Sequence, residues 1–171
     1  MYDQEKVDEF IFRSESLANA VDKDKAFDIL VAEIDKCEDR YLNDYLTALN
    51  FIRNERSLDW IENNIHRTTN ITSNWGHLAA SSYFTWERAD RWLKMGRPLS
   101  LVALDAIYFC TTVGERLNQS PWMRKIQPKL IDNPKSEVIA KTLHEYFATD
   151  RVPRTKTTIE VIIENIFDVR Q

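Results

Sequence analysis

The stretch of sequence that decides the fold lies at residues 98–113, which read PLSLVALDAIYFCTTV. Apolar residues occupy almost every position from Leu99 to Cys110, so the segment has no polar face. A helix that is apolar all round is buried on every side. We therefore expect residues 98–113 to form a helix at the centre of the core, with Pro98 at its first position and Gly114 just after its end.

On both sides of this segment, apolar residues recur with the spacing of amphipathic helices. The predicted helices cover residues 7–21, 27–34, 42–52, 58–65, 75–83, 86–95, 138–147 and 159–167. The last of them is rich in β-branched residues, so a strand at residues 157–163 is the alternative. Because nothing in the sequence pairs with such a strand, helix is preferred. The prediction is a single all-α domain, residues 1–171, with about 8 to 10 helices.

Polar residues and glycine mark the boundaries of these predicted helices. The candidate N-caps are Asp22 or Asp24, Ser57, Asn74 and Thr85, because short polar side chains accept hydrogen bonds from the first helical N–H groups. Gly96 follows the helix at residues 86–95 and is expected to end it in the left-handed conformation. The polar run at residues 67–74 is the clearest loop.

The composition is that of a globular protein and argues against several kinds of site. The chain has only 3 glycines, which disfavours hairpin-rich sheets and phosphate-binding loops. Cys37 and Cys110 have no C-x-x-C spacing, so neither a disulfide framework nor a zinc site is indicated. No stretch approaches 18 apolar residues and the N-terminus has no apolar signal region, so we expect a cytoplasmic protein that does not bind membranes.

Charge is distributed unevenly along the chain. Residues 1–66 hold 16 Asp and Glu against 8 Lys and Arg, whereas residues 67–171 hold 11 against 15. This asymmetry would steer a basic partner toward the N-terminal half, where Glu33, Glu38 and Asp39 are candidate contact residues. A merely solvated acidic face is the alternative. Nucleic-acid binding is not expected, because the basic excess is small and scattered.

Self-similarity appears in the middle of the chain. Leu58-Asp-Trp-Ile61 and Asp90-Arg-Trp-Leu93 are each followed by a turn and an apolar helix, and their tryptophans, Trp60 and Trp92, lie 32 residues apart. The segment Gly96–Ile107 resembles the second helix of a HEAT repeat, with a proline at the helix start and small alanines after it. The resemblance extends over residues 57–113. It implies stacked antiparallel helical hairpins, as a HEAT-like superhelix or an irregular bundle, with a surface for a protein partner.

The general character of the chain suggests a more specific role in binding a protein partner. Small bacterial proteins that are acidic, tryptophan-rich and built of helical hairpins are often immunity proteins, and this chain is similar to them in those respects. The similarity implies a partner that is another protein, in the sharpest case a basic toxin. No signature residue carries this implication, so it is an expectation about the type of protein.

Motifs that would carry catalysis or bind a cofactor or metal are missing from the sequence. The three histidines, His66, His77 and His144, are far apart and form no H-E-x-x-H motif. There is no G-x-S-x-G elbow, and neither cysteine has a histidine near it in sequence. An enzyme is therefore not expected, and no catalytic, cofactor-binding or metal-binding residue is predicted.

Asp105 is the exception, because it lies inside the apolar helix, where a carboxylate must find a partner or shift its pKa. The prediction is a buried ion pair with Arg88, Arg91 or Arg97. A functional carboxylate in a cleft is the alternative, which would make the protein a small helical enzyme or ligand-binding bundle with its site near Asp105.

The aromatic residues at 75–92 are dense, and most of them are expected in the core. Trp86 and Asp90 share one helix face at spacing i, i+4 and are the preferred exposed candidates for partner binding.

Overall fold

The structure is a computed structural model, and it describes residues 2–112 and 128–168. This part of the chain forms nine α-helices and two short 3-10 helices. The α-helices are α1 (Gln4–Ala20), α2 (Lys23–Ile34), α3 (Leu42–Ile52), α4 (Arg56–Asn64), α5 (Ser73–Ser81), α6 (Trp86–Met95), α7 (Leu99–Thr111), α9 (Ser136–Thr149) and α10 (Pro153–Phe167). Among the described residues there is no strand, only an isolated bridge between Thr85 and Ile131. The all-α prediction is confirmed, and α10 shows that residues 159–167 are helical.

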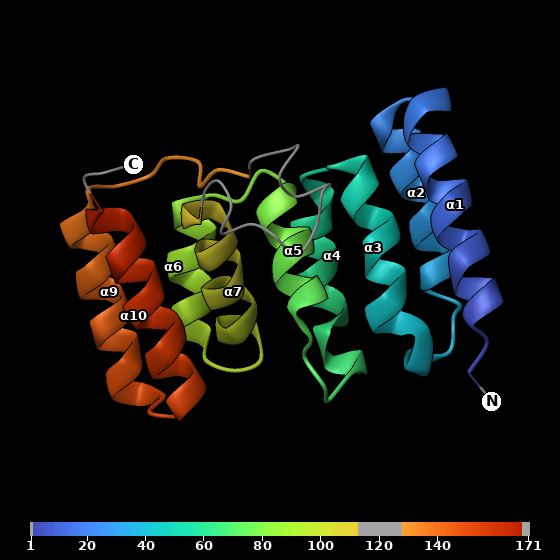
Figure 1. The fold of residues 1–171 in the computed structure, drawn as a ribbon. Coiled ribbons are helices and arrows are strands. Elements are labelled where there is room, and N and C mark those ends of the chain that lie inside the picture. Colours follow the sequence, from blue (N-terminus) through green and yellow to red (C-terminus); the bar gives the residue numbers. More distant parts are fainter. Residues whose placement is uncertain (1, 113–127, 169–171) are drawn as a thin grey trace.

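The helices stand side by side in chain order, from α1 and α2 at one end to α9 and α10 at the other (Figure 1). In one row, α1, α3, α5, α7 and α10 pack on one another in succession. The other helices cover this row: α2 packs on α1 and α3, α4 on α5, α6 on α7, and α9 on α10. The result is a stack of helical pairs in which each pair contacts mainly its neighbours.

The centre of the stack is α7, as the apolar sequence predicted. It packs against α5, α6 and α10, and its side chains from Val102 to Leu104 are almost completely buried. Burying apolar side chains on several sides supplies the main driving force for this arrangement. The helix begins at Leu99 with Pro98 as its N-cap, one residue later than expected. Gly114, the predicted stop, lies outside the described residues.

Three buried tryptophans link successive helical pairs, which we call layers, through their indole N–H groups. Trp60 Nε1 donates to Asp35 Oδ1 at 3.1 Å, and Trp92 Nε1 donates to Glu62 Oε1 at 2.6 Å. Trp75 Nε1 makes the equivalent bond to Asn43, at 2.7 Å. A buried indole N–H needs an acceptor, and in each case the preceding helical pair provides it. The two tryptophans of the predicted repeat therefore make the same kind of contact, one layer apart.

The cap predictions that depend on local geometry are confirmed at two helices. The Asp22 carboxylate accepts the Lys25 N–H at 2.8 Å at the start of α2. The Thr85 hydroxyl accepts the Arg88 N–H at 3.1 Å at the start of α6. Both satisfy an N–H group that has no partner inside the helix.

Two other cap predictions are wrong, because each of these residues lies inside its helix rather than before it. Ser57 lies inside α4, which begins at Arg56; the Asn54 side chain accepts the Arg56 N–H at 2.9 Å and closes that turn. Asn74 lies inside α5, and its amide donates to the backbone carbonyl of Asn43 at 2.8 Å. The side chain that was expected to cap its own helix instead ties α5 to α3.

Gly96 ends α6, but its conformation is not the left-handed helical one that was predicted. Its φ of 79° is positive and its ψ is −174°, a combination open almost only to glycine. The extended ψ turns the chain directly into α7. None of the helices in residues 2–112 and 128–168 is long and apolar enough to cross a membrane.

Candidate functional site

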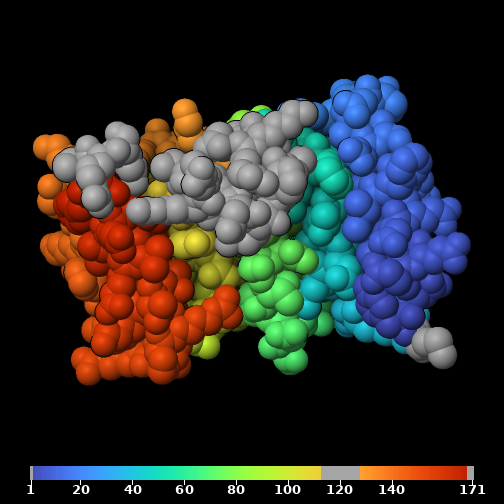
Figure 2. Space-filling model, in the orientation of Figure 1, coloured from blue at the N-terminus to red at the C-terminus, as the bar shows by residue number. Residues whose placement is uncertain are grey.

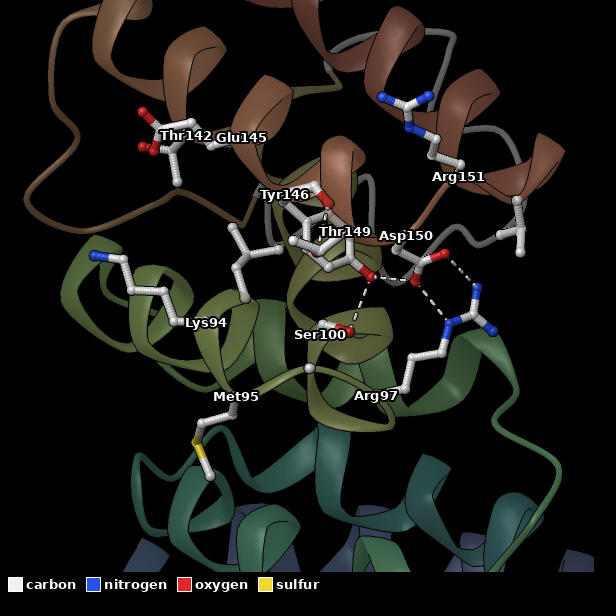
Figure 3. A pocket seen from close by; sticks show the side chains of 13 residues that line it. Lys94, Met95, Arg97, Ser100, Thr142, Glu145, Tyr146, Thr149, Asp150 and Arg151 are labelled. Atoms are coloured by element: carbon white, nitrogen blue, oxygen red, sulfur yellow. Dashed lines mark hydrogen bonds and ion pairs between the residues drawn. The ribbon is translucent and has the colours of Figure 1, made fainter.

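A cleft of about 720 Å³ lies between the turn that joins α6 to α7 and the C-terminal part of α9 (Figure 3). Arg97 donates two hydrogen bonds to the Asp150 carboxylate, at 2.6 and 3.0 Å. The Tyr146 hydroxyl donates to Asp150 at 2.6 Å and lies 2.9 Å from the Ser100 hydroxyl. The four side chains form one connected polar network that joins α9 to the start of α7.

Ionisation in this network is fixed by its own hydrogen bonds. The bonds from Arg97 are the main cause that lowers the pKa of Asp150 to about 2. Burial, together with the bond to Asp150, raises the pKa of Tyr146 to about 12. At neutral pH the carboxylate is charged and the phenol neutral, and each is already paired. The network is therefore a structural connection between layers rather than a set of reactive groups.

A second cavity, of about 390 Å³, lies where α5, α7 and α10 meet, and we call it the Asp105 cavity. It is lined by Ser73 and His77 of α5, Asp105, Tyr108 and Phe109 of α7, and Arg154, Thr157, Thr158 and Val161 of α10. Its volume is at the lower end of the range for small-molecule sites. Polar and aromatic side chains from three helices thus converge on one concave space.

Gly76 explains how this cavity comes to surround Asp105. A Cβ atom added to Gly76 would lie 2.4 Å from the Cβ of Asp105, which is far closer than two carbon atoms can approach. The missing side chain lets the backbone of α5 touch α7 at this crossing. As a result, Asp105 is held against α5. His77, which follows Gly76 in the sequence, lines the same cavity.

The predicted partner of Asp105 is wrong, although an ion pair does exist. Arg154 Nη2 lies 3.3 Å from Asp105 Oδ2, and the Asp105 side chain is 14% exposed whereas that of Arg154 is 64% exposed. Burial raises the pKa of Asp105 above its ordinary value, and the charge of Arg154 only partly opposes this. The carboxylate is therefore the fixed, buried member of the pair and the guanidinium is its exposed member.

The three arginines that were predicted to pair with Asp105 bind other carboxylates. Arg88 lies 2.8 Å from Glu62, to which Arg91 is also paired, and Arg97 binds Asp150. Since these arginines lie on α6 and in the turn after it, they reach α4 and the end of α9, whereas Asp105 faces α5 and α10. They were predicted because they belong to the preceding helix and turn, but the direction of the Asp105 side chain on α7 decides its partner.

Glu62 accepts hydrogen bonds from three side chains of α6, and the sequence reasoning missed this role. Burial alone would raise its pKa, but the hydrogen bonds from Trp92, Arg88 and Arg91 outweigh burial and lower the pKa below its ordinary value. A glutamate at the centre of an otherwise polar helix face gives no local signal of this role. Only the stacking of α6 beside α4 brings the three donors to it.

His77 projects into the Asp105 cavity as a neutral imidazole. Burial lowers its pKa from 6.5 to about 4, so the ring is uncharged at neutral pH. Its centroid lies 3.8 Å from that of the Phe109 ring. Neither ring nitrogen forms a hydrogen bond with any residue in the described ranges. A neutral imidazole offers one donor and one acceptor, so it can bind a ligand as well as shape the cavity.

The face predicted from Trp86 and Asp90 is partly occupied by the protein itself. The Trp86 side chain is half-buried against the core, and its backbone N–H donates to the carbonyl of Ile131 at 2.9 Å. Asp90 accepts from Lys94 at 2.8 Å along α6. Both residues are partly exposed, and their role in partner contact stays a prediction.

The other candidate contacts, Glu33, Glu38 and Asp39, all have basic partners within the chain. Glu33 pairs with Arg13, Glu38 with Arg40 at 3.0 Å, and Asp39 with Arg67 at 2.9 Å. These pairs reduce the field that the three carboxylates present to a partner. The acidic character of the N-terminal half must therefore be expressed mainly elsewhere.

It is expressed on α1, where an aromatic side chain stands among carboxylates. Phe12 is 72% exposed, the highest exposure of any large apolar side chain in residues 2–112 and 128–168. Carboxylates on the same exposed side of the helix are Glu5, Asp8, Glu9 and Glu15. We call these five residues the α1 face. It lies on the terminal layer of the described stack (Figures 1 and 2).

Sequence reasoning missed the α1 face because Phe12 lies off the apolar stripe that defined the helix. The stripe residues Val7 and Phe10 are buried, whereas Phe12 is on the opposite side. An isolated aromatic on the charged side of an amphipathic helix was the available signal. Scattered exposed apolar residues are common, so the signal gains weight only from its acidic surroundings.

Metal binding has no support in the described residues, since no group of three or more His, Cys, Asp or Glu side chains there could hold an ion. Cys37 and Cys110 are both free thiols. Comparison with protein-family models, with curated proteins and with solved structures gives no match to this chain. Function must therefore be argued from the residues themselves.

Proposed function

We propose that the protein is a non-catalytic helical domain that binds another protein, and that the α1 face is its main docking surface. In the sharpest form of this proposal it is a cytoplasmic immunity protein, built of HEAT-like stacked hairpins, that neutralises a basic toxin. The observation that carries the proposal is the exposed Phe12 among the carboxylates of α1.

The α1 face combines the two features that protein docking needs. Burial of a phenylalanine side chain in a partner's pocket contributes about 2 kcal/mol, and such residues are typical centres of binding energy. The surrounding carboxylates speed the encounter with a basic partner and select against acidic ones. The partner that fits this face therefore presents an apolar pocket with lysine and arginine around it.

The test is to search the genes next to the one for this chain for a toxin and to measure protection of cells from its product; neighbouring genes without a toxin would count against the immunity role. Co-expression of the unaltered protein should restore growth, and Phe12→Ala should weaken both protection and the affinity of the purified pair by at least about 30-fold, corresponding to 2 kcal/mol. Val138→Ala is the matched control, because Val138 is 45% exposed on α9, at the far end of the stack.

Equal protection by the Phe12 and Val138 variants would exclude the α1 face. Binding should also weaken as salt is raised, because the carboxylates act over a distance that salt screens. An affinity that does not respond to salt would contradict a basic partner.

A second function is favoured by a specific observation, the Asp105 cavity. A ligand-binding domain, or a small helical enzyme with its site near Asp105, would use a concave space with convergent polar groups and a carboxylate whose pKa burial has raised. Ligand-observed NMR with a library of small polar fragments tests this function. Chemical-shift changes at His77 and Asp105 are the expected result, and changes confined to other surfaces would contradict it.

A further inference from the structure

The Asp105 cavity offers a cation more acceptors than the protein itself uses. Asp105 makes one contact, at 3.3 Å, with Arg154, while a carboxylate has about four lone-pair sites. The cavity-lining hydroxyls of Thr157 and Thr158 donate to backbone carbonyls of α10, at 3.1 and 2.9 Å. Because their protons are engaged within the helix, their lone pairs are what they can offer to the cavity.

The aromatic rings of the cavity add to this preference. Tyr108 and Phe109 pack edge to face with centroids 5.3 Å apart, and the neutral imidazole of His77 lies against Phe109. Aromatic faces attract ammonium and guanidinium groups, and the attraction grows where water is partly excluded. The Asp105 cavity thus combines a carboxylate with aromatic rings, and both attract an organic cation.

Arg154 is a weakly held occupant of this arrangement. Its side chain is 64% exposed, so little packing fixes it. It also lies in the first turn of α10, next to Pro153, where the helix dipole disfavours a positive charge. The guanidinium is free to turn into solvent, whereas Asp105 is confined where α5 touches α7 at Gly76.

From these observations we infer that the Asp105 cavity binds an ammonium or guanidinium group carried on a short hydrocarbon stem, and that Arg154 occupies the site in the free protein as an internal substitute. The ligand displaces Arg154 from Asp105 and places its stem against Tyr108 and Phe109. This inference rests on the second proposed function, ligand binding, and is independent of docking at the α1 face.

The experiment measures binding of n-butylguanidinium and n-butylammonium to the full chain by ¹H–¹⁵N NMR titration. Butyrate and n-butanol are matched probes with the same stem and a negative or no charge. The cations should shift resonances of His77, Asp105 and Arg154, and the other two probes should not. Asp105→Asn removes the charge with little change of shape and should weaken cation binding at least tenfold.

Removing Arg154, which competes with the ligand for Asp105, is a sharper test than the Asp105 variant. Arg154→Met keeps a long apolar stem without the charge and should strengthen cation binding at least fivefold. Lys156→Met is the matched control, because it makes the same change of charge at an equally exposed position of the same helix, and it should leave the affinity unchanged. Since Arg154 is exposed, this arm does not depend on whether the Asp105 variant folds.

Different outcomes would overturn the cationic class of the ligand and the existence of a ligand site in the Asp105 cavity. Butyrate or n-butanol binding in place of the cations would overturn the cationic class and leave a ligand site. If no probe binds to the parent protein or to Arg154→Met, both the cationic class of the ligand and the ligand site itself are overturned. To separate two sources of the same group, N-acetylarginine-N-methylamide is compared with n-butylguanidinium: tighter binding of the amide indicates a side chain of a partner protein, and weaker binding indicates a small free amine or guanidine.

Discussion

His77 shows how one buried side chain couples the stability of the fold to pH. Its pKa is about 4 in the folded protein, whereas an unfolded chain binds that proton near pH 6.5. Between these values the unfolded state holds more protons, so folding should lose stability as pH falls from 6.5 to 4. With 1.36 kcal/mol for each pKa unit, reduced for partial access of solvent to the ring, the loss is about 2 kcal/mol.

His77→Phe should remove this part of the pH dependence, because phenylalanine fills the site without titrating. The measurement is the free energy of urea unfolding of both proteins from pH 7 to pH 4, with His144→Gln as the control for loss of one exposed imidazole. Asp105 acts in the opposite direction, since its raised pKa favours the folded state as pH falls. The difference between the variant and the parent isolates His77, and parallel curves would refute the assignment.

Glu62 provides a second prediction for a single side chain, because it accepts from one indole and two guanidinium groups. Glu62→Gln keeps an acceptor for Trp92 and should cost about 1–2 kcal/mol of stability. Glu62→Ala removes the acceptor of Trp92 and Arg91 and leaves Arg88 with Asp59 alone, so it should cost about 3 kcal/mol. Asp59→Asn is the control: Asp59 is exposed and pairs with Arg88 alone, so the change should stay within about 0.5 kcal/mol. Equal losses at positions 62 and 59, measured by urea unfolding, would show that Glu62 is an ordinary surface charge.

The crossing of α5 and α7 depends on Gly76, and an element-scale prediction follows. Alanine favours a helix over glycine by about 1 kcal/mol, so Gly76→Ala would stabilise an isolated α5. In the stack the added methyl group overlaps Asp105, and the two helices must move apart at a cost of about 2–3 kcal/mol. We therefore expect Gly76→Ala to lower the stability measured by thermal unfolding. Ala80→Gly, in the same helix, is the comparison variant: it changes helix propensity and removes a buried methyl group without creating an overlap. A more stable Gly76→Ala protein would contradict this crossing geometry.

The sequence predicts caps and buried helices that depend on neighbouring residues. It does not predict which helices pack on one another or which side chains meet between them. Asp22 and Thr85 cap helices through groups three residues away, and the apolar run of α7 identifies its burial without further information. Asp105 pairs with Arg154, which is 49 residues away, because α10 packs on α7. No periodicity in the sequence specifies that packing, so the arginines of the preceding helix and turn were chosen wrongly. A cleft at Asp105 was predicted only as the alternative, and the side chains of α5 and α10 that line it were not predicted.

At the scale of the whole molecule, the polar contacts between layers repeat with the helical pairs. Arg56 of α4 binds Asp28 of α2 at 2.7 Å, and Arg88 of α6 binds Asp59 of α4 at 2.9 Å, so the same type of pair occurs one layer further along the stack. The three tryptophan bonds follow the same direction. These polar contacts join neighbouring layers, and they add to the hydrophobic core that runs from Val7 of α1 to Ile162 of α10.

This organisation predicts a gradient of local stability along the stack. In the described chain α7 has helices on several sides, whereas α1 and α2 have neighbours on one side only, so the terminal layer can open while the centre stays folded. Native-state hydrogen exchange should give the highest protection for α5 and α7 and lower protection for α1 and α2. Leu30→Ala, at a fully buried position in α2, should reduce protection of α1 and α2 by about 3 kcal/mol and leave α7 nearly unchanged, while Ile107→Ala in α7 should weaken every layer. If both variants lowered the protection of all helices equally, the stack would be one cooperative unit, and partner binding at the α1 face would then be coupled to the entire fold instead of to its first layer.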